Sequence, residues 1–213
     1  MGCYRINQAK YGTHQLVARL LAPNDLVLDV GCNEGYLASL APDCQFYGID
    51  YDKSAVQIAA KQYKAAYQVD LNSVHALKQL DLPRIFDRIL LIDVLEHLLS
   101  PEEILTELTQ ANLTEHGKVL ISLPNVAHLS VRLNLLLGRF DYTETGILDK
   151  THLHLYTAKS ATQLIKRCGL KVKRIYGSSD RFGRFLHVCP FAIPLLGYNL
   201  IFECASAQKP QHL

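Results

Sequence analysis

The sequence is dominated by a repeated alternation between short apolar runs and longer stretches with helical periodicity. The apolar runs predict strands at residues 26–30, 45–49, 66–69, 86–92, 118–123, 170–176 and 199–205. The stretches between them predict helices at residues 11–21, 35–41, 53–63, 74–80 and 157–168, and one that begins after Ser100. Because helices that connect parallel strands cover both faces of their sheet, the pattern predicts a Rossmann-like, doubly wound α/β fold with a seven-stranded, mostly parallel sheet.

Two regions depart from this alternation. No full helix separates the runs at 170–176 and 199–205, so these last strands are expected to form an antiparallel edge. Residues 125–156 stand between a predicted strand and the next helix, and they predict an insertion at the carboxyl end of the sheet, where such folds bind ligands. A chain of 213 residues suits one domain, so we expect a single domain over residues 1–213.

Local signals mark the ends of two helices. Ser100 is expected to cap the helix that follows it, with Pro101 at the first position and Glu103 completing a capping box. Gly169 is expected to end the helix at 157–168.

Composition narrows the partners and the compartment. The formal net charge of +2, without a basic stripe, argues against a nucleic-acid partner. The six cysteines are scattered without a Cys-x-x-Cys pair, which argues against a cysteine-based zinc site and favours a reducing compartment. The first residues lack the apolar region of a secretion signal, so we expect a cytoplasmic protein.

The late stretch at residues 182–204 is apolar but interrupted by prolines, glycines and an arginine. It therefore does not predict a transmembrane helix. Two interpretations stay open: burial inside the fold, or contact of Phe182, Phe185 and Phe191 with a membrane surface.

The first predicted strand leads into a turn with two glycines, residues 29–35 (DVGCNEG). Glycines let the backbone approach a ligand closely. A dinucleotide site requires G-x-G-x-x-G, whereas here Asn33 stands between Gly31 and Gly35, which disfavours NAD or FAD. Asp50 ends the second predicted strand, at the position of a ribose-binding carboxylate.

Four segments, in order, resemble the motifs of class I S-adenosylmethionine (SAM)-dependent methyltransferases. These segments are 27–35 (VLDVGCNEG), 47–50 (YGID), 69–71 (VDL) and 86–97 (FDRILLIDVLEH). The resemblance spans residues 10–177 and implies SAM as the cofactor and methyl transfer as the activity. The cofactor-binding residues it implies are Asp29, Gly31, Cys32, Asn33, Gly35, Asp50, Tyr51, Asp70, Leu71, Asp93 and Val94.

The chemistry of these residues suits SAM better than a dinucleotide. SAM has no phosphate but carries a sulfonium and an ammonium, which carboxylates stabilise. Asp50 is expected to bind the ribose hydroxyls, although an aspartate after a strand can also cap a helix. Asp29 is expected to orient the turn or meet the ammonium, and Cys32 to pack in the turn. Asn33 replaces a frequent glycine of the family.

Transfer to an oxygen acceptor is an in-line displacement that also requires removal of a proton. We predict His152 as the general base and His97 as the second choice, with a structural role for either histidine left open. Residues 138–157 resemble a signature of bacterial methyltransferases that accompany glycosyltransferases, a resemblance that does not itself define the substrate. From the four motifs and the histidines of the insertion we predict a small-molecule, sugar or glycolipid acceptor. The predicted substrate-binding residues are Asn125, Arg139, Asp149 and His154.

Alternative functions stay open at this point. Glu96, His97 and His152 resemble the metal site of small-RNA 2′-O-methyltransferases and of some quinone-pathway O-methyltransferases, which implies metal-assisted transfer. A catalytically inactive SAM-binding module is another alternative. A nucleotide-dependent oxidoreductase is disfavoured by the missing middle glycine.

Overall fold

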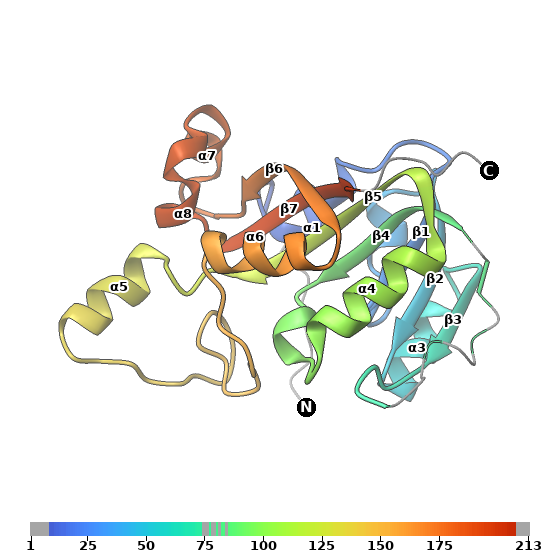
Figure 1. Cartoon of the computed structure of the whole chain (residues 1–213), viewed down its shortest axis with the longest axis horizontal. Coiled ribbons are helices and arrows are strands. Elements are labelled where there is room, and N and C mark those ends of the chain that lie inside the picture. The colour runs from blue at the N-terminus through green and yellow to red at the C-terminus, as the bar shows by residue number, and fades with distance from the viewer. Residues whose placement is uncertain (1–8, 74–76, 78–79, 81, 84, 208–213) are drawn as a thin grey trace.

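The computed structural model of the chain describes residues 9–73, 77, 80, 82, 83 and 85–207. A seven-stranded sheet runs through its centre in the order β3-β2-β1-β4-β5-β7-β6 (Figure 1). In chain order the strands are β1 (Leu26–Val30), β2 (Gln45–Asp50), β3 (Ala65–Gln68), β4 (Phe86–Ile92), β5 (Leu113–Pro124), β6 (Leu170–Gly177) and β7 (Asn199–Ser206). The predicted Rossmann-like α/β fold is confirmed.

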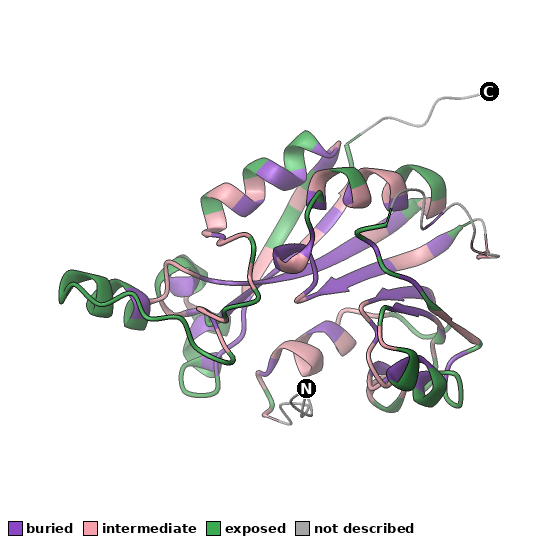
Figure 2. Cartoon of the chain, turned by 90° about the horizontal axis from the view of Figure 1, so that it is seen from below, coloured by how far each residue is buried: buried purple, intermediate pink, exposed green. Residues whose placement is uncertain are grey.

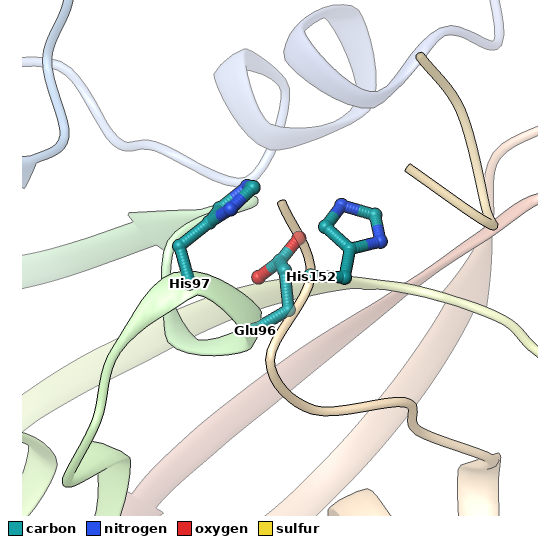
Figure 3. A group of neighbouring side chains, drawn as sticks. All are labelled: Glu96, His97 and His152. Atoms are coloured by element: carbon teal, nitrogen blue, oxygen red, sulfur yellow. The ribbon is translucent and has the colours of Figure 1, made fainter. Parts of the chain in front are cut away.

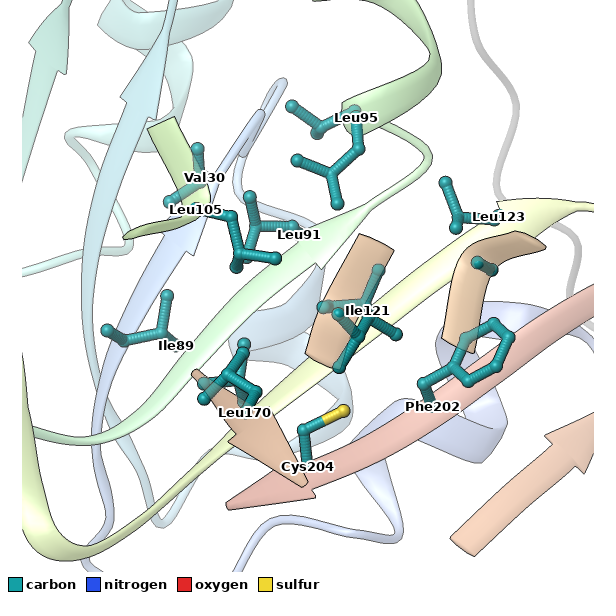
Figure 4. Close-up of a cluster of buried hydrophobic side chains, with 14 of the residues drawn as sticks. Val30, Ile89, Leu91, Leu95, Leu105, Ile121, Leu123, Leu170, Phe202 and Cys204 are labelled. Atoms are coloured by element: carbon teal, nitrogen blue, oxygen red, sulfur yellow. The ribbon is translucent and has the colours of Figure 1, made fainter. Parts of the chain in front are cut away.

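Helices cover both faces of this sheet. The described helices are α1 (Thr13–Ala18), α2 (Leu37–Leu40), α3 (Lys53–Ala59), α4 (Pro101–Asn112), α5 (Leu129–Leu136), α6 (Ala158–Arg167), α7 (Gly183–Val188) and α8 (Ile193–Leu196), with 3₁₀ turns η2 (Leu95–His97) and η3 (Pro190–Ala192), and of these α5 projects away from the sheet (Figure 1). Leu105 of α4 and Leu164 of α6 join one apolar cluster (Figure 4), whereas Val17 of α1 and Ala59 of α3 join another.

The strands feed the two clusters alternately, because successive side chains of a strand point to opposite faces. In β4, Ile89 and Leu91 belong to the first cluster, and Leu90 and Ile92 to the second. Figure 2 shows the resulting buried central strands between more exposed helices. This double coverage explains why β4 reads as a continuous apolar run.

One end of the sheet is antiparallel. Strand β7 pairs antiparallel with β5 on one side and with β6 on the other, while β1 pairs parallel with β2 and β4. The prediction of antiparallel pairing at this edge is confirmed, with β6 as the outermost strand.

The helix ends give one confirmation and one correction. Gly169 follows α6 with a positive φ of 74°, as predicted. Helix α4 begins at Pro101, but the Ser100 side chain makes no capping hydrogen bond, so the predicted capping box with Glu103 is wrong. Ser100 has φ −125° and ψ 67°, whereas Asp52 and Thr157, whose side chains do cap α3 and α6, have an extended backbone.

Several short helices were missed by the sequence prediction. The insertion at 125–156 contains α5, and the stretch at 182–198 contains α7, η3 and α8. The predicted helix at 74–80 lies largely outside the described residues. Among the described residues, none of the helices combines the length and the apolar character needed to cross a membrane.

Candidate active site

A cavity of about 1250 Å³ opens at the carboxyl ends of β1, β2 and β4. Its wall brings together the loops after these strands, the start of α1, the insertion and the segment before α7. Carboxyl ends of parallel strands form the ligand crevice in folds of this type. The cavity is therefore the candidate site, and most of the predicted cofactor-binding residues line it. The exception is Gly35, which does not line the cavity.

The glycine turn after β1 depends on left-handed backbone conformations. Gly31 has φ 75° and Gly35 has φ 80°, and a Cβ at Gly31 would collide with the side chain of Val94. Asn33 also has a positive φ, 48°, which asparagine tolerates better than most residues, and its Oδ1 accepts from the amide of Glu34 at 2.8 Å. The substitution of the family glycine by Asn33 is therefore compatible with the turn.

Asp50 joins the turn to the second strand. Its Oδ2 accepts from the amide of Asn33 at 2.8 Å, and its Oδ1 accepts from the amide of Asp52 at 2.9 Å. Asp52, rather than Asp50, caps α3 by accepting from the amides of Ser54 and Ala55. The carboxylate of Asp50 is thus held in the cavity wall without serving as a helix cap.

Asp29 lies deeper in the same wall and is buried. The hydroxyl of Tyr63 donates to its Oδ2 at 2.6 Å. Burial, together with the nearby negative charge of Asp50, raises the pKa of Asp29 to about 7 despite that hydrogen bond. Burial and the same two carboxylates raise the pKa of the Cys32 thiol, which keeps this cysteine protonated and packed rather than reactive.

A second part of the wall follows β3 and β4. Asp70 holds its own turn by accepting from the amide of Asn72 at 2.9 Å, and Leu71 is buried beside it. Tyr51 lines the rim and is 63% exposed. Asp93 has φ 56°, and its Oδ1 accepts from Ser122 Oγ at 2.6 Å and from Asn199 Nδ2 at 2.7 Å.

Glu96, His97 and His152 form a cluster at the cavity (Figure 3). One candidate ligand atom from each residue lies within 4.8 Å of the others. The two imidazole rings have centroids 4.8 Å apart. Glu96 and His97 come from η2 and His152 from the insertion, so the cluster depends on the insertion folding back over β4.

Backbone carbonyls orient both histidines. Nδ1 of His152 lies 3.1 Å from the carbonyl of Ile147, and Nδ1 of His97 lies 3.2 Å from the carbonyl of Thr151. A carbonyl oxygen only accepts, so in the neutral rings Nδ1 carries the hydrogen. Each Nε2 is consequently left with a lone pair that can accept a proton or bind a cation.

Glu96 is the most unusual member of the cluster. Its side chain is fully buried, and neither carboxylate oxygen has a hydrogen-bond partner. Burial, reinforced by the charge of Asp93, raises the pKa of Glu96 well above its usual value. A buried carboxyl group with no partner is costly unless it is protonated or faces a cation.

The surroundings of His152 set its pKa and the shape of the loop that carries it. Burial lowers the pKa of His152, with the neighbouring His97 adding to the effect and the carbonyl of Ile147 opposing it. The carboxylate of Asp149 accepts from the amide and the hydroxyl of Thr151 at 2.8 and 2.7 Å, so it shapes the loop that carries His152.

Three of the predicted substrate-binding residues do not line the cavity. The Asn125 amide is buried and donates to the carbonyls of Pro194 and Gly197, so its hydrogen-bonding capacity holds the backbone. Nε2 of His154 faces the carbonyl of Leu98 at 3.0 Å, away from His152. Arg139 is exposed beyond α5. Of the four predicted substrate-binding residues, Asp149 alone lines the cavity.

Other cavity residues were missed by the sequence analysis. They are drawn from segments far apart in the chain and include His14, Tyr36, His128, Tyr198 and Asn199. Burial lowers the pKa of His14 against the opposing charge of Asp93. Only the position of Asn199, at the start of a predicted strand, offered a signal that could have identified it.

Known proteins give an independent view of this site. A family model described as a methyltransferase domain matches residues 4–175. The chain is 30% identical over 167 residues to a probable S-adenosylmethionine-dependent methyltransferase of Mycolicibacterium smegmatis, covering 77% of this chain and 58% of that protein. It is also 30% identical over 113 residues to a probable (S)-tetrahydroprotoberberine N-methyltransferase of Papaver bracteatum, covering 46% of this chain and 31% of that protein. The chain thus spans less than two thirds of these relatives.

A solved structure shares the fold. Magnesium protoporphyrin IX methyltransferase of Synechocystis, with bound S-adenosylhomocysteine, aligns with a TM-score of 0.59 at 20% identity, covering 90% of this chain and 78% of that one. The fold and the four strand-end motifs are those of a class I SAM-dependent methyltransferase. This chain belongs to the methyltransferase domain family. The predicted family, and SAM as its cofactor, are confirmed.

Proposed function

We propose that the chain transfers the methyl group of SAM to a hydroxyl of a small molecule, sugar or glycolipid precursor, with His152 as the general base. The observation that carries the proposal is the orientation of His152. The carbonyl of Ile147 fixes its Nδ1, which leaves Nε2 as a base at the cavity that the four motifs surround. The lowered pKa keeps this ring neutral, as a base must be.

In this proposal, different cofactor-binding residues contact different parts of the cofactor. Asp50 accepts hydrogen bonds from the ribose hydroxyls, and Asp29 with the turn at Gly31 faces the amino-acid part. Tyr51, Asp70 and Leu71 surround the adenine. Asp93 and Val94 lie beside the methionine half, next to the cluster of Glu96, His97 and His152. The mixture of carboxylates and apolar groups along this wall suits a cationic nucleoside.

SAM supplies an electrophilic methyl group on a positively charged sulfur. The residues of this chain then have two tasks: to align the acceptor oxygen with that methyl group, and to accept the acceptor's proton at Nε2 of His152. A neutral amine acceptor can attack without prior loss of a proton, so an oriented basic histidine favours oxygen over nitrogen.

The proposed cytoplasmic location of the protein stays a prediction.

A second candidate mechanism is supported by Glu96. Its two unpartnered, buried oxygens and the Nε2 lone pairs of His97 and His152 form a set of ligands that suits a divalent cation. Histidines whose other nitrogen donates to a carbonyl are typical of metal sites. Such a cation would favour the ionised form of a hydroxyl acceptor, and in that case the two histidines would be ligands rather than bases.

A methyl-transfer screen with labelled SAM and cell extract tests the proposal without a prior guess about the acceptor. We expect His152→Ala to lower transfer roughly a hundredfold or more while SAM affinity stays unchanged. The matched control is His154→Ala, because His154 is two residues away, lies against the carbonyl of Leu98 and does not itself line the cavity. Unchanged transfer by His152→Ala would refute the assignment.

Glu96→Gln separates the two mechanisms. If His152 acts as a base, this variant keeps most of its transfer activity, because burial already disfavours a negative charge on Glu96. If a cation is held, both cation binding and transfer fall together. Titration of the protein with Mn²⁺ alone, followed by calorimetry, measures the first quantity directly.

A further inference from the structure

Exposed apolar side chains are concentrated at one end of the molecule. Of the 18 large hydrophobic residues that are exposed among the described residues, 12 lie within 126–140 and 181–198. We call residues 126–140 and 181–198 together the apolar end. In both views these segments lie at the same end of the molecule (Figures 1 and 2). An apolar concentration of this size on a protein surface usually marks a binding face.

Helix α5 is the clearest part of this end. Val131 is its buried residue, whereas Leu133, Leu135 and Leu136 are exposed, Leu136 at 82%. Leu137 follows the helix and is also exposed. Packing against the rest of the chain does not account for these leucines, because the helix projects away from the sheet (Figure 1).

The second part, around α7 and α8, has the same character. Phe185, Val188 and Phe191 are exposed, Phe191 at 84%. The start of α5 is tied to this part, because the Asn125 amide donates to the carbonyls of Pro194 and Gly197. The rings of His128 and Tyr198 also meet edge to face, with centroids 5.8 Å apart. The two parts therefore form one connected surface.

The charges of the apolar end have one sign. Arg132, Arg139, Arg181 and Arg184 lie within it and are exposed, and neither 126–140 nor 181–198 contains an aspartate or glutamate. Phenylalanine and leucine interleaved with arginine are typical of segments that lie in the interface of an anionic membrane. A second copy of the chain is a poorer occupant, because a two-fold interface would bring these arginines together without carboxylates to pair with them.

The apolar end is continuous with the mouth of the cavity. His128, Arg181, Phe182 and Tyr198 belong to the apolar end and also line the cavity. A flat partner that covered this end would therefore lie beside the cavity opening. A molecule anchored in that partner could present its polar group to His152 without leaving it.

We propose that the apolar end docks onto an anionic lipid bilayer and that the methyl acceptor is a lipid-borne molecule. The leucines of α5 and the phenylalanines around α7 enter the interface, and the arginines contact anionic headgroups. The docking claim stands on the surface alone, whereas the acceptor claim rests on the proposed function above.

Flotation with vesicles tests the docking claim. The probes are phosphatidylcholine vesicles with and without phosphatidylglycerol, at low and high salt. We expect the unaltered chain to bind the anionic vesicles more tightly than the neutral ones, and salt to weaken that binding. Leu136→Glu and Phe191→Glu should each weaken partitioning roughly tenfold, and the double variant should abolish it.

Ile85→Glu is the matched control, because Ile85 is as exposed as Leu135, both at 58%, but precedes β4 at the opposite, amino end of the sheet. Its vesicle binding should be unchanged. Failure of the unaltered chain to float, or equal flotation of the double variant, overturns the proposal. A dimer that Leu136→Glu dissociates, without vesicle binding, overturns it in favour of a second copy.

The acceptor claim is tested with labelled SAM and isolated membranes. We expect label in the fraction extracted by organic solvent, and its loss in the Leu136→Glu/Phe191→Glu variant while SAM affinity is kept. Label confined to water-soluble products refutes a lipid-borne acceptor. SAM calorimetry distinguishes failure of the proposed function from failure of the docking claim. If the chain floats with vesicles but does not bind SAM, the proposed function is contradicted and the docking claim stands.

Discussion

The two halves of the cavity are built in different ways. In the cofactor half, Asp50 shows how a strand-end carboxylate is fixed by its own and the adjacent strand–loop unit, because it accepts from the amides of Asn33 and Asp52. Asp93 is the exception, because it also accepts from Asn199 of β7. In the acceptor half, the cluster of Glu96, His97 and His152 joins two segments that are far apart in the chain. His97, for example, meets Thr151, 54 residues later. The cofactor half is thus part of the fold itself, while the acceptor half is assembled by the insertion and the final helices.

This difference predicts separable effects of mutation. Changes in the cofactor half should alter SAM affinity and often stability, because the same backbone carries both. Changes at His152 should alter transfer and leave SAM affinity intact. A variant in either half that changes SAM affinity and methyl transfer equally would contradict this comparison.

The largest effect is expected for Gly31→Ala. The new Cβ would overlap Val94 at a backbone φ of 75°, so unfolding free energy should fall by about 2–4 kcal/mol and SAM binding should be lost. Gly138→Ala is the control, because Gly138 has a similar φ of 72° but open space around a Cβ. It should cost about 1 kcal/mol and leave SAM binding intact. Urea unfolding and calorimetry measure both, and a tolerated Gly31→Ala would contradict the close contact.

Asp50→Ala should come next. Loss of the proposed ribose carboxylate is expected to weaken SAM binding by about 2 kcal/mol, or roughly thirtyfold. Asp52→Ala removes the cap of α3 instead, and it should lower stability by about 1 kcal/mol without changing SAM affinity. Calorimetry and thermal unfolding of the two variants decide the matter. Equal SAM affinities for the two would argue against a ribose role.

Asp29→Asn tests the cofactor half through the pH dependence of folding stability. The folded-state pKa of about 7 lies above the ordinary value of 3.8, so folding takes up a proton between these values and stability falls as pH rises through that window. The asparagine variant should therefore be more stable than the unaltered chain at pH 8, by on the order of 1–2 kcal/mol. The difference should vanish below pH 3.8. Denaturant unfolding across pH tests this, and a pH-independent difference would contradict it.

The smallest effect concerns the acceptor half. Burial lowers the pKa of His152 below 6.5, so the base should stay neutral down to that pH. Transfer at saturating substrates should therefore lose activity on the acid side only below pH 6.5. A pH–rate profile with its acid limb centred above neutrality would show that a different group titrates.

The same contrast explains what could be predicted from sequence. The turn at Gly31 and the position of Asp50 follow from strand ends and residue spacing, which are local properties. The pairing of the last strands was also accessible, because only the short helices α7 and α8, and no full crossover helix, lie between them. In the acceptor half, His152 was named from chemistry alone, and its orientation by Ile147 depends on the course of a loop.

Where the structure departs from the sequence-based expectation, the physical causes are of the same kind. Asn125 follows a strand like the cofactor residues, yet its amide is consumed by the carbonyls of Pro194 and Gly197, some 70 residues later. Ser100 precedes a proline in a pattern typical of a cap, yet its ψ of 67° accompanies an uncapped helix start. Helix α5 was missed because its leucines do not form a buried face.

The central claim is that the strand-end turn binds SAM independently of the acceptor half, and calorimetric titration with SAM tests it most directly. We predict saturable binding of one equivalent, with a dissociation constant in roughly the micromolar range. Asp50→Ala should weaken that binding, and His152→Ala should leave it unchanged. Absence of binding by either SAM or S-adenosylhomocysteine at about millimolar concentration would contradict the account.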